Sequence, residues 1–208
     1  MKNIDSILKD SLNKWNDSNG NYTYSLLHPL NSDSIVVELG GYDGTWVSRM
    51  IPKYNCNYYV LEPIKSFYEK IVQRFESNEK IKVLNFGLST ENKESIIYLN
   101  GDETTLHKKI GEEEKIKLCT LEYLLESIGE NYIDLIQINI EGEEYTLLEY
   151  LINNDILNKV KRMQIQFHTF VENCESRRLK IQEGLSKRGF KKIYDFPFVF
   201  ECWEKILK

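Results

Sequence analysis

The sequence lacks the features of membrane proteins, secreted proteins and metal-stabilised small domains. No apolar run in its 208 residues approaches the roughly 18 residues that a membrane span needs. The N-terminal stretch MKNIDSILKDSLNKW carries scattered charges and has no apolar signal-peptide core. The four cysteines are far apart and include no CxxC pair, which argues against a zinc knuckle or a disulfide framework. We therefore expect a cytoplasmic protein with reduced thiols and no membrane span.

An excess of positive charge is also missing. The net charge of −5 argues against a protein that binds nucleic acid over its whole surface. The hydrophobic content of 41% and the charged content of 28% are ordinary for a globular chain with a substantial core. We therefore expect a globular domain without an extended surface for nucleic acid.

Short apolar runs alternate with longer amphipathic runs from residue 34 onward. This alternation predicts an α/β domain with a mainly parallel sheet, in which ligands bind at the carboxyl ends of the strands. We predict one domain over 1–208, with a helical extension over 1–33 and the core over 34–208. The predicted strands are 35–39, 57–62, 81–86, 95–100, 115–119, 133–140 and 160–168, and a hairpin closes the chain over 190–205. The predicted helices are 3–17, one from near Gly44, one after Pro63, 121–128 capped by Thr120, 142–152 and 173–188.

A glycine-rich loop, in the stretch VVELGGYDGTWV, follows the first strand of the core. Gly40, Gly41 and Gly44 allow a close approach of the backbone to a ligand. Tyr42 stands where the dinucleotide fingerprint G-x-G-x-x-G needs a glycine. Glu62 ends the second strand, where a carboxylate can accept both hydroxyls of a ribose. The pattern favours a nucleoside without a pyrophosphate, namely S-adenosylmethionine, although the same glycines could serve only to pack a helix on a strand.

Several stretches together resemble the FkbM-type S-adenosylmethionine-dependent methyltransferases. They are VVELGGYDGTWVSRMI, YYVLEP, IKVLNFGLS, IDLIQINIEGEEYTLLEYL and IQFH, which follow in the family's order from about residue 34 to 190. The resemblance implies a Rossmann-like class I fold with seven mostly parallel strands, and methylation of a hydroxyl, often on a sugar, nucleotide-sugar or glycan precursor. It places Glu38, Gly40, Gly41, Tyr42, Asp43 and Gly44 in the cofactor loop, Glu62 on the ribose, and Asn85, Phe86 and Gly87 near the adenine.

Two positions depart from the family's pattern. Gln137 stands where the family usually has Lys, and Asn139 stands where it usually has Asp, beside the methyl donor. An amide oxygen at residue 139 can still accept a hydrogen bond from the cofactor or ligate a hard cation. Because the carboxylate is lost, the sequence argues less strongly for a catalytic base or a tight metal site at this position.

An alcohol acceptor needs a base, or a metal ion that makes its hydroxyl more acidic. His168 ends a predicted strand at the same edge as Asn139 and Glu141, and an imidazole suits proton transfer near neutral pH. We predict His168 as the leading base, with Asn139 and Glu141 beside it. The three side chains could also hold Mg²⁺ or Mn²⁺. His168 could instead be a hydrogen-bonded strand end, and the acids could serve only the dipole of the following helix.

Residues that could contact the acceptor are weaker predictions. His107 lies in a polar loop, and Glu144 begins the helix after Glu141. Arg177 and Arg178 belong to a basic cluster that could bind a phosphorylated acceptor or could be a solvated helix face. The N-terminal helix could be a lid or the contact of a homodimer.

Alternatives to a methyltransferase remain open from the sequence. A nicotinamide-dependent oxidoreductase on a related fold is one, although Tyr42 argues against it. A domain that binds the methyl donor without turnover is another, because of Gln137 and Asn139. Methylation of nucleic acid has only the local basic cluster in its favour.

Overall fold

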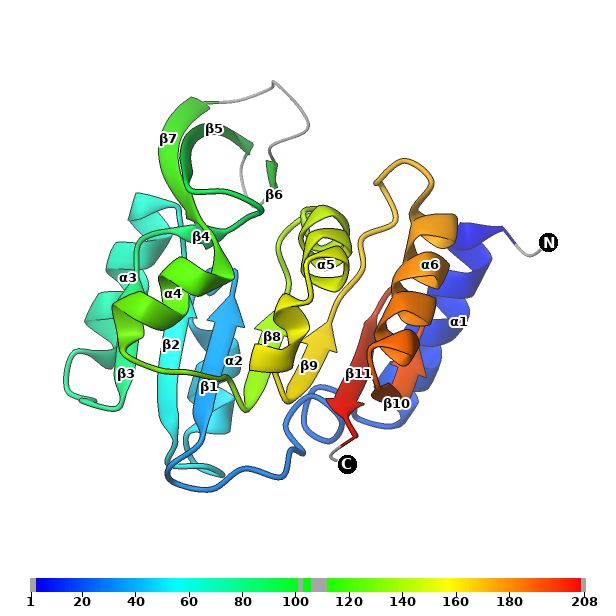
Figure 1. Cartoon of the computed structure of the whole chain (residues 1–208), viewed down its shortest axis with the longest axis horizontal. Helices are drawn as coiled ribbons and strands as arrows, with labels where there is room; N and C mark the ends of the chain where they lie inside the picture. Colours follow the sequence, from blue (N-terminus) through cyan, green and yellow to red (C-terminus); the bar gives the residue numbers. More distant parts are fainter. Residues whose placement is uncertain (1–2, 101–102, 106–111, 207–208) are drawn as a thin grey trace.

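A seven-stranded sheet forms the centre of the computed structural model, which describes residues 3–100, 103–105 and 112–206 (Figure 1). Its strand order is β10-β11-β9-β8-β1-β2-β3. Strands β3, β2, β1, β8 and β9 run parallel, and the hairpin β10–β11 adds β11 antiparallel to β9. The strands are β1 (Ile35–Leu39), β2 (Asn57–Leu61), β3 (Ile81–Leu84), β8 (Leu135–Ile138), β9 (Arg162–Ile165), β10 (Phe190–Phe196) and β11 (Phe200–Lys205). The predicted Rossmann-like α/β fold is confirmed.

Helices cover both faces of this sheet. Apolar residues of α2 and α3 share one buried cluster with alternate residues of β1 and β2. Apolar residues of α4, α5 and α6 share the larger cluster on the other face. The two clusters explain the continuous apolar runs of the central strands, because both faces of a parallel sheet are buried. The helices are α1 (Ile4–Asp17), α2 (Thr45–Met50), α3 (Lys65–Phe75), α4 (Leu121–Ile128), α5 (Glu144–Asn153) and α6 (Cys174–Lys187), with a 3₁₀ turn η1 (Ile156–Lys159).

The N-terminal helix α1 packs against the chain's own hairpin. Its Trp15 is 3% exposed and lies among the rings of Tyr24, Phe196 and Phe200. The indole Nε1 donates to Asn21 Oδ1 at 3.1 Å, in the turn that follows the helix. Aromatic pairs of this kind add to the energy of simple burial. The helix is therefore held on β10 and β11.

A second sheet, of four strands in the order β4-β7-β5-β6, stands beyond the carboxyl ends of β2 and β3 (Figure 1). It consists of β4 (Gly87–Leu88), β5 (Lys93–Asn100), β6 (Glu103–Thr105) and β7 (Glu112–Cys119). The sequence predicted only short strands over 95–100 and 115–119. The observed β5 and β7 are longer and pair with each other antiparallel. Their buried residues pack against Ile64 and Phe67, at the start of α3.

The order of the strands reverses between β1 and β8. The chain runs outward from β1 to β2 and β3, and then returns to β8 and β9 on the other side of β1. The loops after β1 and β8 therefore leave in opposite directions and open a crevice at the carboxyl edge. Across the described ranges, no helix combines the length and the apolar composition needed to cross a membrane.

Candidate active site

The glycine loop after β1 touches the end of β8. Gly40 has φ +79°, and a Cβ at this position would lie 2.1 Å from the backbone oxygen of Asn139. Gly44 has φ +75° and is the N-cap of α2, where a Cβ would lie 2.7 Å from the ring of Phe75. Side chains are disfavoured at such φ values, and neither site has room for one. The two glycines therefore let the loop turn back over the carboxyl edge of the sheet.

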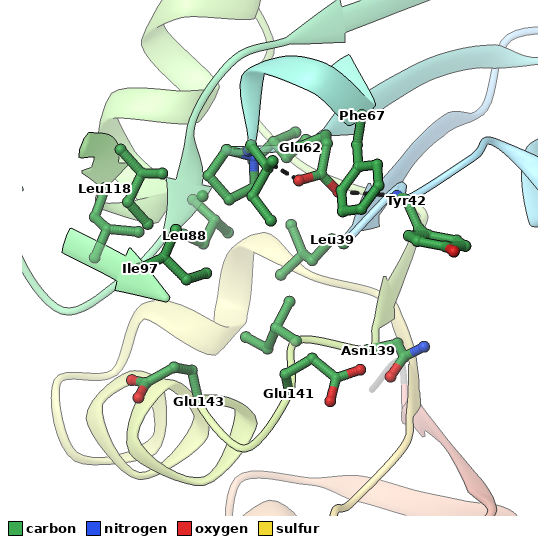
Figure 2. Close-up of a pocket in the computed structure, with 17 residues that line it drawn as sticks. Leu39, Tyr42, Glu62, Phe67, Leu88, Ile97, Leu118, Asn139, Glu141 and Glu143 are labelled. Atoms are coloured by element: carbon green, nitrogen blue, oxygen red, sulfur yellow. Dashed lines mark hydrogen bonds between the residues drawn. The ribbon is translucent and has the colours of Figure 1, made fainter. Parts of the chain in front are cut away.

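Glu62 lies directly after β2 and faces this loop (Figure 2). Its Oε2 accepts the backbone N–H of Tyr42 at 2.9 Å, and its Oε1 accepts that of Ile64 at 2.9 Å. Burial raises the pKa of Glu62 above its ordinary value, and the two N–H groups act in the opposite direction. A carboxylate has about four acceptor positions, so each oxygen keeps one for a further donor. The carboxylate is thus oriented by the backbone and ready for a pair of hydroxyls.

A cavity of about 350 Å³ extends from the glycine loop to the second sheet. In Figure 2, apolar side chains form its end near β5 and β7, and Glu62 and Phe67 lie on one side. Asn139, Glu141 and Tyr42 lie around the opposite end. Ligand sites commonly combine apolar walls with a few oriented polar groups. The apolar end is lined by Ile64, Phe67, Leu88, Ile97, Ile116 and Leu118.

Asn139 follows β8 and lines the polar end of the cavity. Its Oδ1 is buried and has no hydrogen-bond partner among the described residues. A buried acceptor without a partner is costly, so it calls for a ligand or an ordered water. This orphaned oxygen marks the polar end as a binding site.

These features fit an adenosine sulfonium. The apolar end suits the flat adenine ring, and the free acceptor positions of Glu62 suit the two ribose hydroxyls. The carboxylates of Glu141 and Glu143 line the cavity and suit the positive charge of the methionine part. The residues present therefore fit S-adenosylmethionine.

Glu38, in β1, lies behind the loop and is not among the residues that line the cavity. It is 3% exposed, and burial together with the nearby charges of Glu62 and Asp43 raises its pKa well above the ordinary value. The nearby backbone N–H of Val47, in α2, acts on this pKa in the opposite direction. Glu38 is therefore a buried residue behind the lining of the donor cavity.

Other residues predicted around the cofactor hold the loops in place. Asn85 Nδ2 donates to the backbone oxygens of Glu62 and Pro63, both at 3.0 Å. Phe86 packs edge-on against Tyr123, with ring centroids 5.8 Å apart. Of the three residues predicted near the adenine, Asn85 and Phe86 do not line the cavity and Gly87 does.

The remaining residues of the glycine loop also divide into those that line the cavity and those that only hold the loop in place. Asp43 Oδ1 accepts the backbone N–H of Thr45 at 2.9 Å, and Arg74 donates to the backbone oxygen of Asp43 at 2.6 Å. Tyr42 lines the cavity and contacts the ring of Phe67 at a centroid distance of 4.7 Å. A Cβ at Gly41 would lie 2.4 Å from the side chain of Val60, so this glycine brings the loop close to β2.

His168 is held by a buried carboxylate. Its Nδ1 lies 3.0 Å from Glu144 Oε1, which also accepts the backbone N–H of His168 at 2.8 Å. The other oxygen of Glu144 accepts the N–H of Gly142 at 2.8 Å, and the residue is 0% exposed. A carboxylate is an acceptor only, so Nδ1 carries the hydrogen and Nε2 has the free lone pair. Glu144, predicted at the acceptor, is instead the partner that orients His168.

The Nε2 of His168 faces a residue that lines the donor cavity. It lies 3.7 Å from Glu141 Oε2, and Glu141 lines that cavity. Burial lowers the pKa of His168, but the hydrogen bond to Glu144 and the charges of Glu144 and Glu141 outweigh it and raise the pKa above the ordinary value. Tyr145 Oη donates to the backbone oxygen of His168 at 2.9 Å and fixes the segment further. The arrangement brings together the predicted base, Glu141 and Asn139 at one edge of the sheet.

Within the described part of the chain, no group of three or more His, Cys, Asp or Glu side chains is arranged to hold a metal ion. The two arginines predicted to contact a phosphorylated acceptor lie away from the cavity and pair with acidic residues. Arg177 pairs with Glu149 through two contacts of 2.8 Å, and Arg178 is buried between Asp195 and Glu201. Neither arginine lines the cavity. The predicted contact at residue 107 lies outside the described residues.

Comparisons with known proteins agree with this geometry. Residues 38–196 match the family model of the methyltransferase FkbM domain. An rRNA methylase from Streptococcus thermophilus has a similar solved structure, with a TM-score of 0.55, 17% identity, and coverage of 91% of this chain and 95% of that chain. SMU.1697c, a putative methyltransferase from Streptococcus mutans in complex with SAH, has a TM-score of 0.56, 10% identity and coverage of 91% and 97%. Sequence comparison with curated proteins gives no match.

The solved structures establish the class I methyltransferase fold, and the family model establishes the family. It spans residues 38–196, well over half of the 208 residues, and includes the glycine loop, Glu62, Asn139 and His168. An oxidoreductase on a related fold is therefore set aside. The chain belongs to the FkbM methyltransferase family and is an S-adenosylmethionine-dependent methyltransferase.

Proposed function

We propose that the chain methylates a hydroxyl oxygen of a carbohydrate, with His168 as the general base. The observation that carries the proposal is the placement of His168, whose Nδ1 is fixed by Glu144 and whose Nε2 faces Glu141 at the rim of the donor cavity. A base in this position suits an acceptor that must lose a proton, as an alcohol must. The resemblance of the sequence to hydroxyl-methylating enzymes supports the same acceptor class.

The residues of the donor cavity act by alignment. S-adenosylmethionine supplies a methyl carbon that its sulfonium already activates. Glu62 holds the ribose hydroxyls, and the apolar wall of the second sheet holds the adenine. Asn139 Oδ1 accepts a hydrogen bond at the polar end and fixes the direction of the methyl group. Alignment of reacting groups can supply roughly 7–11 kcal/mol of the barrier in the best cases.

His168 takes the proton that the reaction releases. Bound S-adenosylmethionine would supply the methyl group to the acceptor oxygen and would leave as S-adenosylhomocysteine. The acceptor's O–H proton moves to Nε2, and the imidazolium later passes it to water. Glu144 and Glu141 stabilise this imidazolium, since both charges favour the protonated ring. The base therefore needs no metal in this proposal, and Asn139, Glu141 and His168 are given no metal-binding role.

Methyl transfer by a His168→Asn variant tests the proposal. Transfer from radiolabelled S-adenosylmethionine to a panel of methyl glycosides should fall about 10²- to 10⁴-fold, the usual contribution of a general base. Affinity for S-adenosylhomocysteine, measured by calorimetry, should change little and is the internal control. Wild-type rates in the variant would remove His168 from the mechanism. Binding without transfer to any hydroxyl by the wild type would instead favour a domain without turnover.

RNA is a second acceptor to include in this panel, because two of the similar structures bear the printed name rRNA methylase or putative rRNA methylase. At sequence identities of 17% and 8%, the similarity to these two structures indicates a shared fold and not a shared acceptor. The net charge of −5 and the glutamates around the donor cavity disfavour a polyanion. We expect no methylation of RNA.

A further inference from the structure

A second cavity, of about 420 Å³, includes His168 in its lining. Three segments form it: helix α1 with the turn after it, the stretch 166–170 after β9, and the turn 198–200 at the start of β11. Strand β11 is antiparallel to β9, with Glu201 opposite Ile165, so this turn lies at the carboxyl end of β9. The second cavity thus opens at the same edge of the sheet as the donor cavity.

The two cavities come close to each other at Glu141 and His168. Glu141 lines the donor cavity, and His168 lines the second cavity. Glu141 Oε2 and His168 Nε2 are 3.7 Å apart. A group seated in the second cavity would therefore present its nearest atoms to the base and to the polar end of the donor cavity.

The walls of the second cavity are aromatic. Trp15, Phe167 and Phe198 line it and are buried, at exposures of 3%, 1% and 5%. Phe170 is different, because 52% of it is exposed. Its ring lies 5.3 Å from the ring of His168, between centroids, at an interplanar angle of 43°. An aromatic face attracts partial positive charge, such as that on the C–H bonds of one side of a sugar ring.

The polar groups of the second cavity are amides. Asn16, on α1, and Gln166, after β9, line it and offer both donors and acceptors to hydroxyl groups. Asn21 also lines it, but its Oδ1 already accepts from Trp15. Among the residues that the structure describes, no Lys, Arg, Asp or Glu side chain lines this cavity. A phosphate or nucleotide would find no lysine or arginine here and would be repelled by Glu141 beside His168, whereas a neutral polyol would find partners for its hydroxyls.

We infer that the second cavity is the acceptor site and that it binds a neutral sugar. The sugar packs on Phe170, bonds to Asn16 and Gln166, and places its reacting hydroxyl at His168 Nε2. The inference rests on the proposed hydroxyl methylation and adds the site and the charge class of the acceptor. It also makes α1 a wall of the acceptor site, because Leu8, Leu12, Trp15 and Asn16 belong to the lining.

Saturation-transfer NMR tests this inference with the full chain and S-adenosylhomocysteine present. The probes are the methyl glycosides of glucose, mannose, galactose and rhamnose, with glucose 1-phosphate and UDP-glucose as charged counterparts. Two variants alter the site: Phe170→Ala removes the exposed ring, and Leu12→Trp fills the cavity from α1, where Leu12 is 41% exposed. The matched control is Leu179→Ala, an apolar residue of α6 that is 55% exposed and does not line the cavity.

We expect at least one neutral glycoside to bind, with the strongest contacts on one face of its ring. Phe170→Ala should raise the Kd of this glycoside roughly 3- to 10-fold, which is the usual contribution of an aromatic contact. Leu12→Trp should weaken it at least as much, and Leu179→Ala should not change it. All three variants should bind S-adenosylhomocysteine as the wild type does.

Three binding results would overturn the inference: binding of the phosphorylated probes alone, no contact with any sugar, or wild-type binding in both site variants. Methyl transfer to some other hydroxyl, unaffected by Phe170→Ala, would end the inference and leave the proposed function standing. Bound S-adenosylhomocysteine with no transfer to any hydroxyl would end the proposed function itself.

Discussion

Replacement of Glu62 by Gln tests the donor cavity at its most constrained residue. Both carboxylate oxygens of Glu62 accept backbone N–H groups at 2.9 Å, from Tyr42 and Ile64. A glutamine has one carbonyl oxygen, so its NH₂ group must face one of these two N–H donors. The variant keeps the shape of the side chain but leaves one buried N–H group unpaired and removes the charge that a ribose hydroxyl would meet.

The size of both effects follows from these contacts. An unpaired buried N–H group costs about 1–3 kcal/mol of folding free energy. A hydrogen bond to a charged group contributes about 1.5–3 kcal/mol, so loss of one to the ribose should raise the Kd roughly 10- to 100-fold. The control is Glu69→Gln on α3, whose side chain is 62% exposed. This substitution should change neither the folding free energy nor the Kd measurably.

Two assays separate these effects. Urea unfolding without ligand measures the stability loss, and calorimetry with S-adenosylhomocysteine measures the affinity. The expected result is a moderate loss of stability together with the larger Kd. An unchanged affinity in a folded Glu62→Gln variant would refute the assignment of Glu62 to the ribose, even if stability falls as predicted.

Three further predictions concern the base, the buried acid and the glycine loop. Glu144→Gln should shift the acid limb of kcat/KM to lower pH, because Glu144 raises the pKa of His168 and the base must be neutral; an unmoved limb would contradict the pairing. Glu38→Gln should gain stability over the wild type as pH rises above about 4.5, because folded Glu38 has a raised pKa and holds its proton after the unfolded chain has lost it; urea unfolding at several pH values would show a constant difference if this is wrong. Gly40→Ala should lose at least about 1–2 kcal/mol of stability from its positive φ alone, and more from the clash with Asn139; a wild-type melting temperature would contradict it.

The seven-stranded fold could be predicted because its signals are local. The apolar runs of β1, β2 and β8 and the glycines of the following loop act within a few residues of the chain. Thr120 was predicted as a helix cap, and its Oγ1 does accept the N–H of Tyr123 at 3.3 Å. The predicted strands were too long at their carboxyl ends, so Asn85, Asn139 and His168 lie beyond β3, β8 and β9. Those extensions are the site loops, where polar contacts replace strand pairing.

Other parts of the site depend on contacts between distant residues. Glu144 and His168 are 24 positions apart, and their contact follows from the pairing of β8 with β9. The apolar wall of Ile97, Ile116 and Leu118 comes from a second sheet whose pairing the short runs did not reveal. In the sequence, Arg178 belongs to a basic cluster that could bind a phosphorylated acceptor or face solvent. In the structure, it is buried and pairs with Asp195 and Glu201. A charge pattern alone could not show which cation is buried.

The most direct test is a crystal structure of the chain with S-adenosylhomocysteine. The account predicts adenine against Phe67, Ile97 and Leu118, both ribose hydroxyls on Glu62, and the sulfur at the end of the cavity that holds Asn139 and Glu141. A ligand that binds elsewhere, or one that reaches this cavity without touching Glu62, would contradict it.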